Sequence, residues 1–173
     1  MADAAIIFDV DGVLLELTQA EEDCFFEAFR RRYGLTGLSR DWDSYHIRND
    51  QDIATEILER HGLPIAECAA VLADYLAILS EDLAPVEIAG ARALLQSLSG
   101  ARLGIATANI REAARLRLAA RDLWSPVETY AFGADGGGHK REIVARAIAA
   151  TGLPKERIVY IGDNVNDVDA GFS

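Results

Sequence analysis

Short, nearly unbroken apolar runs alternate with helix-like stretches along much of the chain. Four such runs occur, at 4–8, 101–107, 127–132 and 157–161. Continuous hydrophobicity over so few residues is typical of strands that helices cover on both faces, as in parallel sheets. A helix-like stretch precedes each of the three later runs, at 88–98, 111–121 and 140–150. The alternation of strand and helix predicts an α/β fold with a doubly wound parallel sheet.

The stretch between the first two apolar runs has a different character. It contains no convincing strand and predicts helices at 18–32, 50–60 and 64–82. Thr18 to Glu21 has the form of a capping box, and Gly34 is a typical terminator of the first helix. Asn49 or Asp50 is expected to cap the second helix. We therefore expect a core formed by residues 1–15 and 86–173, with a helical insertion over 16–85.

Length and composition narrow the class of protein. A chain of 173 residues is long enough for one domain with a modest insertion. A net charge of −11 and a pI near 4.6 argue against general binding of nucleic acid or anionic membrane surfaces. Cys24 and Cys68 are isolated and predict buried thiols in a reducing compartment. With no segment of membrane-spanning length and no signal-peptide pattern, we expect a cytoplasmic protein.

Two carboxylates, Asp9 and Asp11, follow the first apolar run directly. A buried carboxylate is costly unless it binds a cation or takes part in chemistry, and ligands of open α/β sheets lie beyond the carboxyl ends of the strands. The pair therefore marks a candidate active site. The alternative is a simple turn, since Asp and Gly favour turns. A calcium loop of the EF-hand type is excluded because Val13 stands where the third ligand is needed.

Polar groups also end the second and the last apolar runs. Thr107 ends the former, and Gly162-Asp163-Asn164-Val165-Asn166-Asp167 follows the latter. Parallel strands place their carboxyl ends along one edge of the sheet, so these groups can converge with Asp9 and Asp11. The hydroxyl of Thr107 and the free amides of Ala108 and Asn109 predict an anion cradle. The acids of the first and last strands predict a hard oxygen site suited to Mg²⁺.

A glycine-rich loop, Gly133 to Gly138, leads through His139 to Lys140 at a helix start. The loop superficially suggests a phosphate-binding P-loop. The match fails, because His139 separates glycine from lysine and Arg141 replaces the Ser or Thr. Lys140 is nevertheless well placed for a phosphate, with a solvated surface lysine as the alternative.

These motifs, in this order, resemble those of the haloacid dehalogenase superfamily over nearly the whole chain. Asp-Val-Asp-Gly-Val-Leu-Leu is similar to the first motif of that family, Ile-Ala-Thr-Ala-Asn to the second, the Lys140 region to the third and Ile-Gly-Asp-Asn-Val-Asn-Asp to the fourth. The resemblance implies a Rossmann-like core with a helical cap inserted between motifs one and two. Asn49-Asp50 is similar to a Thr-Asp pair of such caps.

The resemblance also implies a phosphatase mechanism and roles for single residues. Asp9 is the expected nucleophile, which forms an aspartyl-phosphate, and Asp11 the expected acid and base. Mg²⁺ is expected between Asp9, the backbone carbonyl of Asp11 and Asp163, with Asp167 orienting this shell. Phosphoryl oxygens are expected to be held by a second group of residues: Thr107, Ala108, Asn109 and Lys140.

Several alternatives stay open at this stage. Asp11 favours phosphoryl chemistry over dehalogenation, because a dehalogenase characteristically lacks this second Asp. A phosphosugar mutase would keep the same residues, and Arg141 could share or take the role of Lys140. The sequence stops just after the fourth motif, which leaves 157–161 at an expected sheet edge and raises the hypothesis of a truncated, catalytically impaired protein that binds phosphometabolites. We expect a small phosphorylated metabolite as substrate, and a monomer or homodimer.

Overall fold

A four-stranded parallel sheet forms the centre of the protein. The computed structural model describes residues 3–81 and 83–163. The strands lie in the order β5, β4, β1, β6, with bounds Tyr130–Phe132, Arg102–Ala106, Ala5–Phe8 and Ile158–Ile161. Each neighbouring pair is parallel. The predicted fold class and all four predicted strands are confirmed, with β6 at an edge among the described residues.

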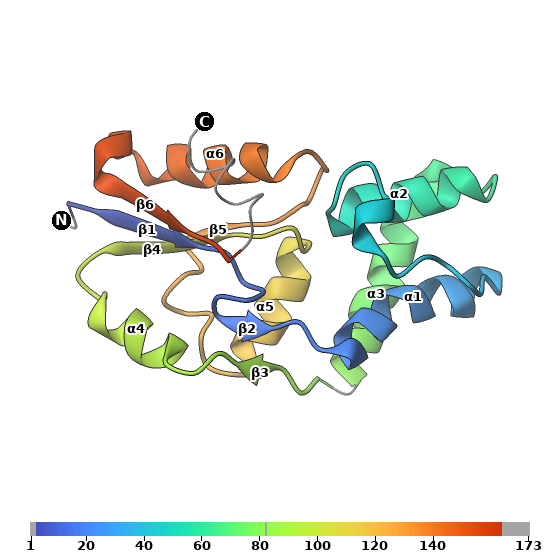
Figure 1. Cartoon of the computed structure of the whole chain (residues 1–173), viewed down its shortest axis with the longest axis horizontal. Coiled ribbons are helices and arrows are strands. Elements are labelled where there is room, and N and C mark those ends of the chain that lie inside the picture. Colours follow the sequence, from blue (N-terminus) through green and yellow to red (C-terminus); the bar gives the residue numbers. More distant parts are fainter. Residues whose placement is uncertain (1–2, 82, 164–173) are drawn as a thin grey trace.

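Helices cover both faces of this sheet. α6 (Lys140–Thr151) lies on one face, and α4 (Ala91–Ser97) and α5 (Arg111–Ala119) lie on the other (Figure 1). Neighbouring residues of β1 serve the two sides: Ile7 packs in the cluster with α6, and Phe8 in the cluster with α4 and α5. Successive side chains of a strand point to opposite faces, so two buried faces require an unbroken apolar run.

Several predicted elements are shorter in the structure; for example, the helix expected at 64–82 is an α-helix only over Cys68–Glu81, and that expected at 111–121 ends at Ala119. The strand expected at 127–132 begins only at Tyr130, because Val127 accepts the Tyr130 amide across a turn at 3.2 Å. Val127 is fully buried, so its hydrophobicity serves the core from a turn and not from the sheet. The helix expected at 88–98 spans Ala91–Ser97.

The segment between the first two sheet strands is helical, as predicted. It contains α1 (Gln19–Tyr33), α2 (Asp50–Arg60) and α3 (Cys68–Glu81), with short 3-10 turns at Trp42–Ser44 and Ile65–Glu67; a third such turn, Lys155–Arg157, precedes β6. The capping box of Thr18 and Glu21 is confirmed, and α1 ends at Gly34 with φ of 69°. Among the described residues, no helix has the length and apolar character needed to span a membrane.

Aromatic side chains form the core of this helical insertion. Phe25, Phe26 and Phe29 of α1 are buried, and Phe25 meets Tyr75 of α3 edge to face at 5.4 Å. The same core includes Ile110 and Ala113, so the insertion packs directly against the start of α5. Cys24 and Cys68 are free thiols; Cys68 is buried in this core, as expected, whereas Cys24 is only partly buried against it.

Two very short strands join the insertion to the rest of the protein. β2 (Leu15–Glu16) pairs antiparallel with β3 (Val86–Glu87), so the chain enters and leaves the insertion side by side (Figure 1). The sequence did not indicate these strands, because two residues carry no measurable periodicity. The expected boundary at 15/16 lies inside β2, and that at 85/86 directly precedes β3.

Candidate active site

A cavity of about 810 Å³ lies between the carboxyl ends of the sheet strands and the helical insertion. Eight residues singled out from the sequence line it: Asp9, Asp11, Thr107, Ala108, Asn109, Lys140, Arg141 and Asp163. They come from four separate regions of the chain, and the parallel sheet brings them to one edge, as the strand order predicts. Asp167 lies outside the described residues.

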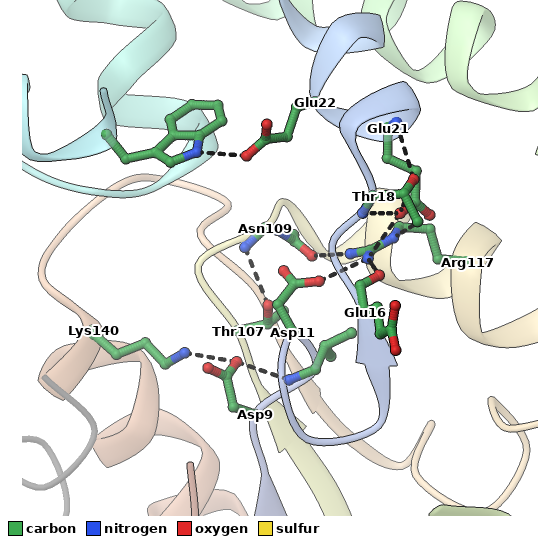
Figure 2. A network of polar contacts seen from close by, with 12 residues as sticks. Asp9, Asp11, Glu16, Thr18, Glu21, Glu22, Thr107, Asn109, Arg117 and Lys140 are labelled. Carbon is green, nitrogen blue, oxygen red and sulfur yellow. Dashed lines mark hydrogen bonds and ion pairs between the residues drawn. The ribbon is translucent and has the colours of Figure 1, made fainter. Parts of the chain in front are cut away.

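Asp9 is the most enclosed acid at this edge. It follows β1 directly and is only 7% exposed. Its Oδ1 accepts the amide of Val10 at 2.8 Å and lies 2.7 Å from Nζ of Lys140 (Figure 2). Lys140 is the first residue of α6, and its side chain is 15% exposed, whereas Arg141 is exposed. Of these two cations, Lys140 is therefore the one seated at the Asp9 carboxylate.

The glycine-rich loop before Lys140 binds the insertion. Gly138 donates its amide to Asp52 Oδ2 at 2.8 Å, and Asn49 donates Nδ2 to the Gly138 carbonyl at 2.8 Å. Gly137 has φ of +74°, and a Cβ there would lie 2.8 Å from Asp52 Oδ1. The loop needs glycine for this close approach. The loop therefore hydrogen-bonds to the start of α2. This role differs from that of a P-loop, whose sequence pattern it did not match.

The start of α2 also contacts the loop after β4. Asn49 caps α2 by accepting the Asp52 amide at 2.8 Å, which confirms one of the two expected caps. Asp50 donates its amide to the Ala108 carbonyl at 3.0 Å and accepts the Ile110 amide through Oδ2 at 2.9 Å. The insertion is thus hydrogen-bonded to two loops that line the cavity.

The expected anion cradle after β4 is only partly open. Thr107 is buried, and its Oγ1 accepts the Asn109 amide at 3.2 Å, so the Asn109 amide expected to be free is engaged in this structure. The next amides are occupied too: that of Ile110 by Asp50, and that of Arg111 by Asp135 Oδ2 at 2.8 Å. Acidic side chains therefore accept the free amides at the start of α5. The partial positive charge at the amino terminus of a helix favours such acidic partners.

The sequence reasoning missed one central residue, Arg117. This residue of α5 is 1% exposed and lies at the centre of the polar network in Figure 2. It has four polar partners: Asp11 Oδ1 at 2.7 Å, the Glu21 carboxylate at 2.8 Å and 3.3 Å, Asn109 Oδ1 at 2.9 Å and the Glu16 carbonyl at 3.0 Å. Burial by itself lowers the pKa of the guanidinium, but Asp11 and Glu21 raise it further than burial lowers it.

A sequence signal for Arg117 did exist. The buried residues of α5 are Ala113, Ala114, Arg117 and Leu118, which follow the spacing of one helix face. A charged residue on an apolar stripe needs a buried partner, because an unpaired buried charge is very costly. The pattern could therefore have marked Arg117 as paired, although not with which acids.

Comparison with known proteins identifies the family. A family model of haloacid dehalogenase-like hydrolases matches residues 4–173. The chain belongs to this family. The classification agrees with the resemblance of its four motifs. A search of curated proteins gave no significant match.

Solved structures share the fold of this haloacid dehalogenase-like hydrolase. CbbY from Rhodobacter sphaeroides, solved in complex with phosphate, is 22% identical with a TM-score of 0.66 over 99% of this chain and 82% of that one. A proposed phosphoglycolate phosphatase from Lactobacillus plantarum is 20% identical, with a TM-score of 0.68 over 99% and 83%. A proposed β-phosphoglucomutase from Bacteroides vulgatus is 18% identical, with a TM-score of 0.70 over 98% and 71%.

The acids of this hydrolase suit a magnesium ion in type and position. A Cβ placed on Gly12 would lie 2.0 Å from Asp163 Oδ2, so the Asp163 carboxylate lies directly against the loop that follows Asp9. Within residues 3–81 and 83–163, no group of three or more His, Cys, Asp or Glu side chains is arranged to hold a metal ion by itself. Mg²⁺ usually keeps several waters and uses one or two carboxylates. Asp9, Asp163 and the Asp11 carbonyl fit that requirement.

Replacement of Gly12 tests this close approach. We expect Gly12→Ala to be strained twice, by its φ of +75° and by the clash with Asp163. Gly37→Ala is the matched control, because Gly37 has φ of +73° and nothing within 4 Å of a built Cβ. Urea unfolding should show a loss of about 1 kcal/mol for the control and more for Gly12→Ala. Weakened Mg²⁺ binding by calorimetry is expected only in Gly12→Ala; equal binding in both variants would contradict the placement of Asp163.

Asp50 is expected to make the stability of the fold depend on pH. Burial raises the pKa of its carboxyl to about 7, the Ile110 amide opposes the rise, and the charge of Asp11 adds to it. The folded state therefore holds this proton more tightly than the unfolded state. The unfolded chain releases it first as the pH rises, so this contribution to stability is lost between about pH 4 and pH 7.

Asp50→Asn should remove that dependence. Between pH 5.5 and pH 8 we expect the wild type to lose about 2 kcal/mol of unfolding free energy, since each pKa unit corresponds to about 1.4 kcal/mol. An asparagine keeps an oxygen that accepts from Ile110 and does not titrate. Urea unfolding at the two pH values should therefore give a flatter profile for the variant. Parallel profiles for the two proteins would show that Asp50 does not titrate in this range.

Proposed function

We propose that this hydrolase cleaves the phosphomonoester of a small phosphorylated metabolite, with Mg²⁺ as cofactor and an aspartyl-phosphate on Asp9 as intermediate. One observation carries the proposal. An enclosed carboxylate at the end of β1 lies 2.7 Å from the Lys140 ammonium, in a cavity that Thr107 also lines. A phosphate at this position would meet a nucleophile and a cation together. Membership of a hydrolase family supports the same reading.

In the first half of the proposed reaction, an Asp9 oxygen attacks the phosphorus. The P–O bond to the leaving group breaks, and Asp11 gives that oxygen a proton. Lys140 and Thr107 hold the remaining phosphoryl oxygens, together with the backbone at Ala108 and Asn109, where the Asn109 amide exchanges its bond to Thr107 Oγ1 for one to the phosphate. Bound Mg²⁺ would supply charge neutralisation between the Asp9 carboxylate and the phosphate dianion.

In the second half, water attacks the phosphorus of the aspartyl-phosphate. Asp11 accepts a proton from this water, the bond between phosphorus and Asp9 breaks, and phosphate leaves. One residue can act first as acid and then as base because the first step leaves it deprotonated. Asp11 lines the cavity two residues from Asp9, within reach of both roles.

We further propose that the helical insertion, residues 16–85, is a cap that selects the leaving group. Its wall of the cavity combines aromatic and polar side chains, among them Phe25, Trp42, Tyr75 and Glu22. Trp42 Nε1 donates to Glu22 Oε1 at 2.8 Å, which fixes both side chains (Figure 2). Three hydrogen bonds to the core loops, one donated by Asn49 and two accepted by Asp50 and Asp52, support a closed cap in this structure.

A phosphosugar mutase is the second candidate. The Bacteroides vulgatus structure, a proposed β-phosphoglucomutase, shares the fold. A mutase would return the phosphoryl group from Asp9 to a sugar, whereas a phosphatase gives it to water. Phosphate released in proportion to alcohol favours the phosphatase, and an isomeric sugar phosphate without phosphate release favours the mutase.

The test is a panel of small phosphomonoesters with Mg²⁺ and with EDTA. Metal-dependent phosphate release, greatest for one class of ester, is the expected result. If no ester reacts although the protein is folded and binds Mg²⁺, a non-catalytic phosphometabolite-binding protein becomes the better description. Equal release in Mg²⁺ and EDTA would overturn the metal-dependent mechanism.

A further inference from the structure

Arg117 joins three parts of the molecule that the proposed reaction needs together. Its guanidinium comes from α5, a helix of the core, and contacts Asp11 beside the nucleophile. It also donates to Asn109 in the loop after β4. The remaining contacts go to Glu21 and the Glu16 carbonyl, where the chain enters the insertion. Figure 2 shows these partners arranged around one side chain.

The contact with Asp11 distinguishes the two oxygens of that carboxyl group. Oδ1 lies 2.7 Å from Arg117 Nη2 and is closed to solvent; the geometry is that of a charge contact, not of a directed hydrogen bond. The Asp11 side chain as a whole is 25% exposed and lines the cavity. Since Oδ1 contributes nothing to this exposure, Oδ2 is the oxygen that can meet a substrate or water.

We propose that Arg117 is a positioning residue for proton transfer: it fixes Oδ1 of Asp11 and so leaves Oδ2 to exchange protons with the leaving group and with water. This inference rests on the proposed phosphatase function. Arg117 itself touches no reacting atom. Its planar guanidinium presents several donors in a fixed geometry, which lets it hold Asp11, Glu21 and Asn109 at once.

The burial of Arg117 explains why this arrangement holds its shape. The side chain is 1% exposed and Glu21 is 5% exposed, so neither has water as an alternative partner. Glu21 Oε2 also accepts from the Thr18 amide at 3.0 Å, which ties the network to the cap of α1. Displacing a catalytic carboxyl group by as little as an ångström from its productive position can lower the reaction rate about a hundredfold.

Two esters with different leaving groups separate this role from simple support of the fold. An alkoxide needs a proton from Asp11 to leave, whereas p-nitrophenolate leaves without one. Loss of positioning should therefore slow the first turnover of an alkyl phosphate and spare the first release of p-nitrophenolate. A general structural defect would slow both alike.

The test uses the double variant Arg117→Met with Glu21→Gln, which avoids leaving the buried Glu21 carboxylate unpaired, and compares it with Glu21→Gln alone. We expect the first-turnover rate constant for the alkyl ester to fall at least about tenfold, and that for p-nitrophenyl phosphate to stay within about threefold. Arg117→Lys should retain part of the rate for the alkyl ester, because lysine keeps the positive charge but lacks the planar guanidinium with its several donors. Arg115→Met, on the same helix and paired with Glu112 at 2.6 Å, should match the wild type.

Each outcome has one meaning. Equal losses for both esters in the folded double variant would overturn the positioning role, as would no loss for either. If the double variant does not fold, the same comparison is made with Arg117→Lys. An alkyl-ester rate in Arg117→Lys equal to that of the wild type would then overturn the positioning role. A wild type that cleaves neither ester would instead refute the proposed function, which is therefore tested separately.

Discussion

Asp9→Asn should lose metal-dependent phosphate release by a factor of at least about 10³, because the amide oxygen of asparagine is a poor nucleophile and no covalent route remains. The fold should be retained. Asparagine has almost the same shape and keeps an oxygen that can accept the Val10 amide, which Asp9 Oδ1 accepts at 2.8 Å. The measurement is phosphate release from the best ester of the panel, with thermal unfolding recorded on the same protein.

The stability of Asp9→Asn should stay close to that of the wild type, because the variant loses the ion pair with Lys140 at 2.7 Å but also loses the repulsion between Asp9 and the other acids. Asp9, Asp11 and Asp163 place like charges around one cavity, and a neutral residue at position 9 relieves their repulsion. Asp23→Asn, a replacement on the exposed side of α1, serves as the control for the chemical change alone. Retention of more than a tenth of the activity in Asp9→Asn would show that the nucleophile is another residue. A phosphorylated peptide containing Asp9, trapped by acid quench of the wild type, would support the intermediate directly.

The strands and their functional ends could be predicted because they are local patterns with a simple physical cause. A strand buried on both faces needs an unbroken apolar run, and Asp9 directly after such a run has a cost that only chemistry or a cation explains. The helix ends were equally local. Thr18 with Glu21, and Gly34 with its positive φ, satisfy backbone groups within a few residues of themselves.

The remaining features depend on residues far apart in the chain. The pairing of Leu15–Glu16 with Val86–Glu87 joins two segments too short to show a period. Arg117 is 96 positions from Glu21, and its partners follow only from the packing of α5 against the insertion. The shared amides of the loop after β4 have the same origin, because Asp50 reaches Ile110 from the helical insertion. Sequence patterns identify residues that need partners, but the partners come from the tertiary fold.

Lys140→Met should reduce kcat/KM about a hundredfold to a thousandfold, the usual effect of removing one preorganised group that stabilises developing negative charge. The ammonium group lies 2.7 Å from Asp9 Oδ1 and is mostly enclosed, so water cannot replace it without rearrangement. A phosphate attached to Asp9 would meet this cation at the start of α6. Methionine keeps much of the length and apolar volume of the lysine stem while it removes the charge.

Arg141→Met is the matched control, because it removes a cation from the next residue of the same helix. Arg141 lines the cavity but is exposed, whereas Lys140 is mostly enclosed and makes the ion pair with Asp9. We expect a loss of no more than about fivefold for Arg141→Met, since exposed charges are well screened by solvent. A larger loss in Arg141→Met than in Lys140→Met would reverse the two roles. Equal losses would mean that the two cations share the phosphate, and the enclosure of Lys140 would then reflect its packing against β1 more than its chemistry.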